Sequence, residues 1–444
     1  MPPFARRLAL AVVIASFGCD RGEAPPDPPP DATEAPPASG APGASAIASA
    51  SAFTPEAPPP RPPEPWLAEQ LRRGDPRFSA WLDRAEAIRL QILVRVLDAP
   101  GKPGKTHAYR ADAEYLYPAS AIKTFLAVAT LAELNRDVDG EIPLGTRIMR
   151  CRDDRGGCEP PREDEDDSEG AEAEDGKKKH EKLYLGQELQ KLLAYSDNDA
   201  YNRLWDILGH RRANEAVVRL GFPGVRLNHK MNAPPDKSLK TLRTTLLVPG
   251  KAAIRVPRRV SDLLLAPTDA ARLEEGEAYN DAGKRIDEPM SFANKNHASL
   301  SDLARLHLSL VRPDHPDALP LGLSDGQREH LLRAMTRPLR GAHADDHAPF
   351  GPGVTAVLDP KRVRYISKSG RAYGFHIENA YVEDTESGRA ILLTAGCYAN
   401  DNGVLNDDDY SYDALSRPLL AAIGEEMTRA FLTEDAAVTD DGPR

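Results

Sequence analysis

Three short strings of residues constrain most strongly how this chain can fold. They are Ser120-Ala121-Ile122-Lys123, Ser196-Asp197-Asn198 and Lys368-Ser369-Gly370. Each is the only match in the 444 residues to its pattern, which is S-x-x-K, S-D-N and K-[ST]-G respectively. A nucleophilic serine needs a neighbouring base to remove its proton. A fold that brings the three strings together would therefore place three serines and two lysines in one nucleophilic site.

The first string begins a stretch that predicts a buried helix. Residues 120–134 are apolar on nearly all sides of a helix, as expected in the middle of a domain. Ser120 is expected at the N-cap or in the first turn, and Lys123 lies on the same face. Lys123 either extends to solvent or is buried, where desolvation and a nearby cation such as Lys368 would lower its pKa. We favour the buried arrangement.

The order of the other expected elements indicates an α/β fold. Strands are predicted over 90–97, 107–117, 362–367, 374–383 and 390–398. Separate helices are predicted over 66–88, 183–208, 301–311, 324–335 and 412–432. Residues 237–295 are expected to be irregular, with a small hairpin at 246–256. Strands at both ends with helices between them predict one sheet with an inserted all-α lobe.

The N-terminal residues predict export. Residues 1–19 have a charged start and an apolar stretch, Leu8 to Phe17, that is too short for a permanent membrane helix. Ser16-Phe17-Gly18-Cys19 resembles a lipoprotein cleavage site, so we expect Cys19 to be lipidated, with ordinary secretion as the alternative. Lipidation would anchor the protein to a membrane without spanning it. The Pro-rich residues 20–64 predict a disordered stalk before a folded domain at 65–433.

The net charge and the cysteines limit which binding partners and cross-links are expected. The net charge of −11 argues against a nucleic-acid partner. In an oxidising compartment Cys151 and Cys158 could close a small disulfide. The rival metal site lacks a second pair of ligands, so no metal is expected. Cys397 is expected to be buried. The charged run at 160–182 predicts a solvated, disordered insertion, and residues 434–444 a tail.

The three strings in this order, with their surroundings, resemble class A β-lactamases of the β-lactamase and penicillin-binding protein transpeptidase-like superfamily. Tyr117-Pro118-Ala119 resembles the family's entry to the nucleophile helix, residues 195–202 its second motif with the trailing Ala-x-Asn, and residues 297–306 a later helix start. The intervals between the strings are longer than usual. The resemblance covers about residues 66–432. It implies an antiparallel sheet flanked by helices in three αβα layers, with an inserted all-α lobe.

The resemblance also implies a function for the site. We expect a monomeric cell-envelope or periplasmic serine hydrolase that uses no cofactor and acts on a β-lactam or a peptidoglycan stem peptide. Ser120 would be the nucleophile and Lys123 its base, while Ser196 would pass a proton to the leaving nitrogen and Lys368 would polarise that relay. The N–H groups of Ser120 and Arg371 could form an oxyanion hole. The residues expected to bind substrate are Asn198, Ser369, Gly370 and Arg371.

The loop at 226–235 departs from the family pattern. Class A β-lactamases carry a glutamate there that activates the water releasing the acyl-enzyme, and Met231 stands in its place. Pro235 likewise replaces an asparagine. His229 is the only free base expected in this loop, and we interpret it as a surface residue. We therefore expect acylation at Ser120 with slow release. A D-Ala-D-Ala carboxypeptidase or penicillin-binding protein, a true lactamase and a non-catalytic peptidoglycan-binding module remain open alternatives.

Overall fold

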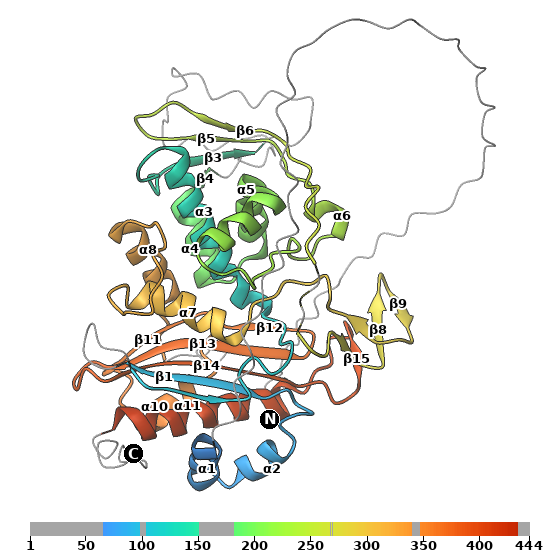
Figure 1. Cartoon of the computed structure of the whole chain (residues 1–444), viewed down its shortest axis with the longest axis vertical. Helices are drawn as coiled ribbons and strands as arrows, with labels where there is room; N and C mark the ends of the chain where they lie inside the picture. The colour runs from blue at the N-terminus through green and yellow to red at the C-terminus, as the bar shows by residue number, and fades with distance from the viewer. Residues whose placement is uncertain are drawn as a thin grey trace, which may run out of the picture. The chain divides into compact units, whose positions relative to one another are not determined.

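The computed structural model describes residues 65–97, 104–150, 182–266, 268, 270–339 and 347–433 (Figure 1). All of these residues belong to one compact unit. The predicted signal, the stalk, the charged insertion and the tail lie outside the described residues. Cys19, Cys151 and Cys158 lie outside them as well, so lipidation and the disulfide stay predictions.

Six strands from the two ends of the described chain form the central sheet: β1 (Gln91–Leu97), β2 (Thr106–Tyr109), β11 (Val363–Ser367), β12 (Gly370–Ala372), β13 (Phe375–Asp384) and β14 (Ala390–Tyr398). Their order is β11-β13-β14-β1-β2, with β12 also paired to β13, and every pairing is antiparallel. All residues of β14 are buried, because the sheet is covered on both faces. The sheet therefore joins segments that are far apart in the sequence (Figure 1).

Helices cover both faces of this sheet, so the expected αβα layering is confirmed (Figure 1). One face packs against α7 (Leu300–Val311). The other packs against helices from both ends of the described chain, α1 (Pro65–Gly74), α2 (Arg77–Asp83), α10 (Gly351–Val357) and α11 (Arg417–Leu432). Alternate residues of each strand enter the two cores, as the two-residue period of a strand requires. On β1, Leu93 lies in one core, and Ile92 and Val94 lie in the other.

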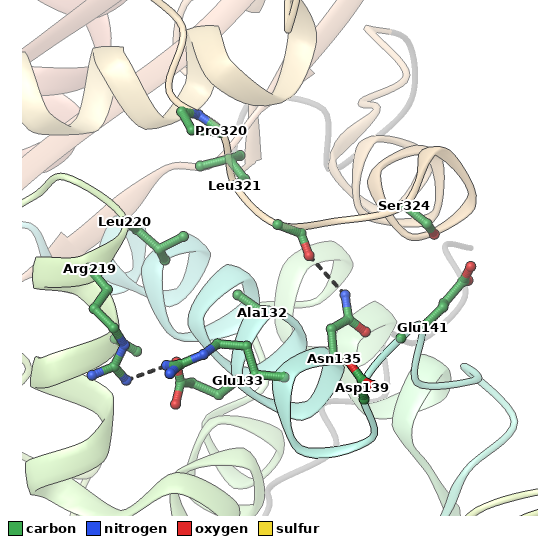
Figure 2. A pocket seen from close by; sticks show the side chains of 14 residues that line it. Ala132, Glu133, Asn135, Asp139, Glu141, Arg219, Leu220, Pro320, Leu321 and Ser324 are labelled. Atoms are coloured by element: carbon green, nitrogen blue, oxygen red, sulfur yellow. Dashed lines mark hydrogen bonds and ion pairs between the residues drawn. The ribbon is translucent and has the colours of Figure 1, made fainter.

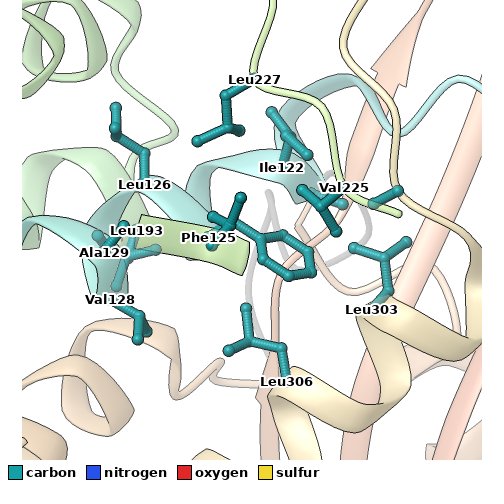
Figure 3. Close-up of a cluster of buried hydrophobic side chains, with 14 of the residues drawn as sticks. Ile122, Phe125, Leu126, Val128, Ala129, Leu193, Val225, Leu227, Leu303 and Leu306 are labelled. Carbon is teal, nitrogen blue, oxygen red and sulfur yellow. The ribbon is translucent and has the colours of Figure 1, made fainter. Parts of the chain in front are cut away.

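The inserted helical lobe surrounds one apolar helix. The lobe contains the 3₁₀ turn η1 (Ala119–Ile122), α3 (Lys123–Asp137), α4 (Leu185–Ala194), α5 (Asn198–Arg219) and α8 (Asp325–Met335). Residues 123–134 of α3 are all buried. Phe125 lies in the centre of the lobe core among Ile122, Val225, Leu303 and Leu306 (Figure 3). The predicted buried helix is therefore confirmed. Among the described residues no helix has the length and apolar character needed to cross a membrane.

Short strands make up much of the remaining structure. One small sheet contains β3 (Arg147–Arg150), β4 (Leu183–Tyr184), β5 (Thr244–Leu247) and β6 (Ile254–Val256). The pairing of β5 with β6 confirms the predicted hairpin. The remaining elements are α6 (Pro235–Ser238), β7 (Glu274–Glu275), β8 (Ala278–Asp281), β9 (Lys284–Ile286), β10 (Met290–Ser291), β15 (Val404–Leu405) and the π-type turn η2 (Tyr412–Ser416). β7 pairs with β10, and β8 pairs with both β9 and β15.

Several predicted boundaries differ from the structure. The helices expected over 66–88 and 183–208 are each divided into two, and two other differences have a clear local cause. The strand expected over 107–117 ends at Tyr109, because Arg110 and Asp112 adopt positive φ angles of 52° and 62°, which interrupt an extended strand. The helix expected from Ser301 begins at Leu300, where Ser299 is the N-cap and forms a capping box with Asp302.

Replacing Phe125 with alanine should lower the free energy of unfolding by about 3–5 kcal/mol, because it opens a cavity in the lobe core. Phe125 is fully buried, and its ring centroid lies 5.1 Å from that of Phe222. Urea unfolding followed by circular dichroism measures the change. Leu264, which is 93% exposed, provides the control, since Leu264→Ala should change stability by less than about 0.5 kcal/mol. Equal effects of the two substitutions would contradict this prediction.

Candidate active site

Ser120 is the accessible point of an otherwise buried segment. It is half-buried, whereas residues 114–119 and 121–134 are all buried. It lies inside η1 and is not the N-cap, because that position is taken by Pro118 and the helix proper begins only at Lys123. Ala119, directly before it, has a positive φ of 44°. The chain therefore turns sharply into the buried helix and presents the serine at the turn.

Lys123 is fully buried, so the interpretation in which it extends to solvent is wrong. Its Nζ donates hydrogen bonds to the main-chain oxygen of Ser196 at 2.5 Å, to Ser196 Oγ at 3.2 Å and to Asn198 Oδ1 at 2.6 Å. A protonated lysine has three donors, and each has a partner here. Burial lowers the pKa of Lys123 to about 8, while Asp197 acts in the opposite direction. Near neutral pH, part of the population can therefore act as a base.

Ser196 lies at the junction between α4 and α5. It has a positive φ of 57°, and the next residue, Asp197, caps α5 by accepting a hydrogen bond from the N–H of Ala200. Ser196 Oγ accepts hydrogen bonds from both Lys123 Nζ and Lys368 Nζ, at 3.2 Å and 3.0 Å. A hydroxyl has two acceptor sites and one donor. With both acceptor sites occupied, its proton is available for a further acceptor, such as a leaving nitrogen.

Lys368 follows directly after β11 and is buried. Only 2% of the residue is exposed, its N–H donates to the oxygen of Asn379, and its Nζ also donates to the oxygen of Ser369. Burial lowers the pKa of Lys368 well below its usual value, and the cations Lys123 and Arg337 lower it further. Two lysines with low pKa values thus meet at one serine hydroxyl.

Gly370 allows β12 to lie against the nucleophile turn. A Cβ atom at this position would lie 2.8 Å from the nitrogen of Ala121 and 2.9 Å from that of Ser120, closer than side-chain atoms approach backbone. The main chain of Gly370 and Arg371 therefore runs beside Ser120. Ser369 is half-buried, and the exposed Arg371 has its guanidinium carbon 5.3 Å from the ring centre of Tyr412. The hydrogen bonds of Lys123 and Lys368 with Ser196, and the close approach of Gly370 to the Ser120 backbone, thus bring the three strings together.

The loop at 226–235 contacts α5 through Met231. The side chain of Asn202 accepts a hydrogen bond from the Met231 N–H at 2.9 Å and donates one to its oxygen at 3.0 Å. His229 is half-buried, so our interpretation of it as a surface residue was wrong. Burial lowers the pKa of the His229 ring to about 4, although the hydrogen bond with the Lys230 backbone acts to raise it. The ring is therefore neutral at physiological pH, with its Nδ1 bonded to the oxygen of Lys230.

Two charged residues near the site lie outside the three strings and were not predicted. Arg337 follows α8, and the fully buried Glu378 lies on β13, where Tyr365 donates a hydrogen bond to its carboxylate at 2.8 Å. Burial raises the pKa of Glu378 to about 7. A glutamate in the middle of an apolar strand is the one sequence signal that could have identified it. Among the described residues no cluster of histidine, cysteine or carboxylate side chains could hold a metal ion.

A hollow of about 520 Å³ lies at the far end of α3 from Ser120 (Figure 2). Glu133 and Arg219 form an ion pair of 2.8 Å on its wall, and Asn135 donates to the oxygen of Gly322 across it. Leu220 and Leu321 supply apolar lining. None of the residues predicted for the site lines this hollow, so it is separate from the candidate active site.

Comparison with known proteins assigns the family. The contacts of Lys123 and Lys368 with the Ser196 hydroxyl suit a serine hydrolase of lactam or amide bonds. A model described as the β-lactamase enzyme family matches residues 77–423, and the chain therefore belongs to this family.

Several solved structures are similar to the chain. A β-lactamase from Xanthomonas campestris is 16% identical, with a TM-score of 0.45, over 83% of this chain and 99% of that one. A class A β-lactamase from Clostridium kluyveri is 16% identical, with a TM-score of 0.43, over 81% and 100%. A carbapenemase from Vibrio cholerae is 15% identical, with a TM-score of 0.43, over 78% and 97%. Comparison with curated proteins gives no match.

The buried lysine should make stability depend on pH. The pKa of Lys123 is about 8 in the folded protein and near 10.5 in the unfolded chain. Between these values the unfolded chain binds more protons, so the free energy of unfolding should rise as the pH increases from about 8 to about 10.5. Lys123→Met should reduce this rise, as measured by urea unfolding at a series of pH values. Lys361→Met, at an exposed position, should leave it unchanged, and an equal slope in both variants would contradict the prediction.

Proposed function

We propose that this protein is an exported serine acyl hydrolase that is acylated at Ser120 by β-lactams or acyl-D-Ala-D-Ala-like amides and releases the acyl group slowly. The observation that carries the proposal is the Ser196 hydroxyl, which accepts hydrogen bonds from Lys123 and Lys368 beside the Ser120 turn. This arrangement can remove a proton from a nucleophile and supply one to a leaving nitrogen. Both steps are needed to break an amide bond.

Acylation begins at Lys123. When it loses a proton, it keeps two donors for its short bonds to Ser196 and Asn198, and its lone pair can accept the Ser120 proton. Ser120 Oγ then forms a bond to the carbonyl carbon, and the carbonyl electron pair moves onto its oxygen. The N–H groups of Ser120 and Arg371 would stabilise that oxyanion.

Collapse of this intermediate requires a proton on the leaving nitrogen. As the carbon–nitrogen bond breaks, Ser196 Oγ gives its proton to the nitrogen and takes a replacement from protonated Lys123. Lys368 polarises the same hydroxyl and, with Ser369, attracts the carboxylate that β-lactams and D-Ala-D-Ala peptides share. Gly370 leaves room for the substrate backbone along the edge of β12.

Release of the acyl group lacks an evident base. Met231 provides no proton acceptor, and no Asp or Glu lies between Glu215 and Asp236. This observation favours a second candidate, a D-Ala-D-Ala carboxypeptidase or penicillin-binding protein, for which β-lactams are slowly released inhibitors. A non-catalytic peptidoglycan-binding module is less consistent with the site, because binding alone does not require a buried lysine beside the serine.

The N-terminal residues favour a location in the cell envelope. A signal at residues 1–19, an acylated Cys19 and a stalk at 20–64 would hold a monomeric enzyme near a membrane. The substrate would be a small β-lactam or a peptidoglycan stem peptide, with no nucleic acid and no cofactor.

Mixing the protein with benzylpenicillin should add one penicilloyl mass, detected by intact-mass spectrometry. Ser120→Ala should abolish the adduct, whereas Ser79→Ala, at an exposed position of α2, should preserve it. The acylation rate should rise as the pH increases through about 8, because Lys123 must be neutral to act as the base. Rapid multiple turnover of a chromogenic cephalosporin would contradict slow release. An adduct that persists in Ser120→Ala would contradict the choice of nucleophile.

Met231→Glu should accelerate release of the penicilloyl group. Asn202 holds the main chain of Met231, so a carboxylate introduced there starts from a fixed backbone position. A positioned general base contributes about 10²- to 10⁴-fold, and we expect a gain toward the lower end. The decay of the adduct mass after removal of free penicillin measures this rate. Met231→Gln has the same shape without the base and should release at the wild-type rate. Equal rates in the two variants would contradict the assignment of this position.

A further inference from the structure

One arginine outside the three strings contacts the chain just before two of them. Arg337 Nη1 donates to the oxygen of Ala194 at 2.8 Å, and its Nη2 donates to the oxygen of Leu193 at 2.5 Å. Nη2 also donates to the oxygen of Ser367 at 3.4 Å. Ala194 lies two residues before Ser196, and Ser367 directly precedes the lysine of the third string. A single guanidinium therefore joins the backbone that leads into both strings.

The backbone of Arg337 is itself attached to the sheet. Its N–H donates to the oxygen of Tyr365 at 2.9 Å, and the preceding residue, Thr336, forms an antiparallel bridge with Ile366. Arg337 thus extends from a fixed position beside β11 toward the end of α4. The hydrogen bond between Ser196 Oγ and Lys368 Nζ links the helical lobe to the same strand.

The end of α4 is a position where a cation has a physical use. The last carbonyls of a helix have no partner within the helix, and a positive charge there is favoured. Ser196 follows almost at once with a left-handed φ of 57°, so its hydroxyl depends on where α4 ends. A guanidinium can bond several carbonyls from one rigid plane, whereas a lysine offers a single point charge.

We propose that Arg337 is a positioning residue that holds the Ser196 hydroxyl in register with the Lys368 ammonium. The kinetic part of this inference rests on the proposed function, because it assumes that the two groups act in acylation. Loss of the guanidinium would free the end of α4 from β11. A misplacement of about 1 Å in a catalytic group can reduce a rate about 10²-fold.

Arg337 also adds a positive charge beside Lys368. The charged groups that act on Lys368 are Lys123 from α3, Arg337 and the opposing Glu378 from β13. Removing the charge of Arg337 should raise the pKa of Lys368, so Lys368 would stay protonated to higher pH. Arg337→Lys keeps the positive charge but loses the planar guanidinium that bonds several carbonyls. Arg337→Gln loses both the charge and the guanidinium. The two variants therefore separate geometry from charge.

The test measures the second-order rate of acylation by a fluorescent penicillin across a range of pH. Arg337→Lys should slow acylation about 10- to 100-fold. It should not change the pH at which the rate falls on the basic side of the profile, where Lys368 loses its proton. Arg337→Gln should slow acylation and move this decline in rate to higher pH. Arg333→Gln is the matched control, because Arg333 is exposed on α8, the helix that Arg337 follows, and pairs with Glu329 at 2.8 Å. It should react at the wild-type rate.

Two further readouts distinguish positioning from a general loss of structure. In a Ser196→Ala background, Arg337→Lys should have little additional effect, because residues that act as one unit are not additive. A crystal structure of Arg337→Lys should show the Ser196–Lys368 hydrogen bond broken. Wild-type acylation by Arg337→Lys, additive losses, or an intact hydrogen bond would each overturn the proposal. If the wild type itself takes no label, the proposed function fails, and the crystal structure still decides the role of Arg337.

Discussion

Two lysine side chains meet at the hydroxyl of one half-buried serine, and the surrounding structure makes this contact possible. Charged groups lose much of their hydration when buried, so the energetic cost is large unless partners are present. Lys123 comes from α3, Ser196 from the junction of α4 and α5, and Lys368 from the end of β11. Three elements must therefore be held to within the length of a hydrogen bond. The two large apolar cores provide that rigidity, and some of their stability offsets the unfavourable burial of charge at the site.

Apolar periodicity was sufficient to predict the parts of the fold that surround this contact. The buried helix after Ser120, the hairpin of β5 and β6, and the bounds of β14 were confirmed, because each has a continuous run of apolar residues or a clear turn signal. β7 to β10 were not predicted, because strands of two to four residues contain too few positions for a pattern. The early end of β2 depended on backbone angles at Arg110 and Asp112 that residue type alone does not determine.

The site was predictable only where its residues belong to recognisable strings. Ser120, Lys123, Ser196 and Lys368 could be named because nucleophile, base and relay have characteristic neighbours. Arg337 could not, because its partners are main-chain carbonyls, which leave no pattern in the sequence. The burial of His229 was also missed, since it results from packing between loops that are distant along the chain. Residues that belong to recognisable strings can thus be found from the sequence more readily than residues whose partners are main-chain groups.

The pairing of β1 with β14 has a consequence for how the protein is made. β1 lies in the interior of the sheet, but its neighbour β14 lies far along the chain and is synthesised long after it. Contacts between segments so distant in sequence slow folding, because a long loop must close before they form. The growing chain must keep β1 and the nucleophile helix without their final packing until the C-terminal strands emerge. Premature termination after the third string would leave an apolar strand exposed, and such edges promote aggregation.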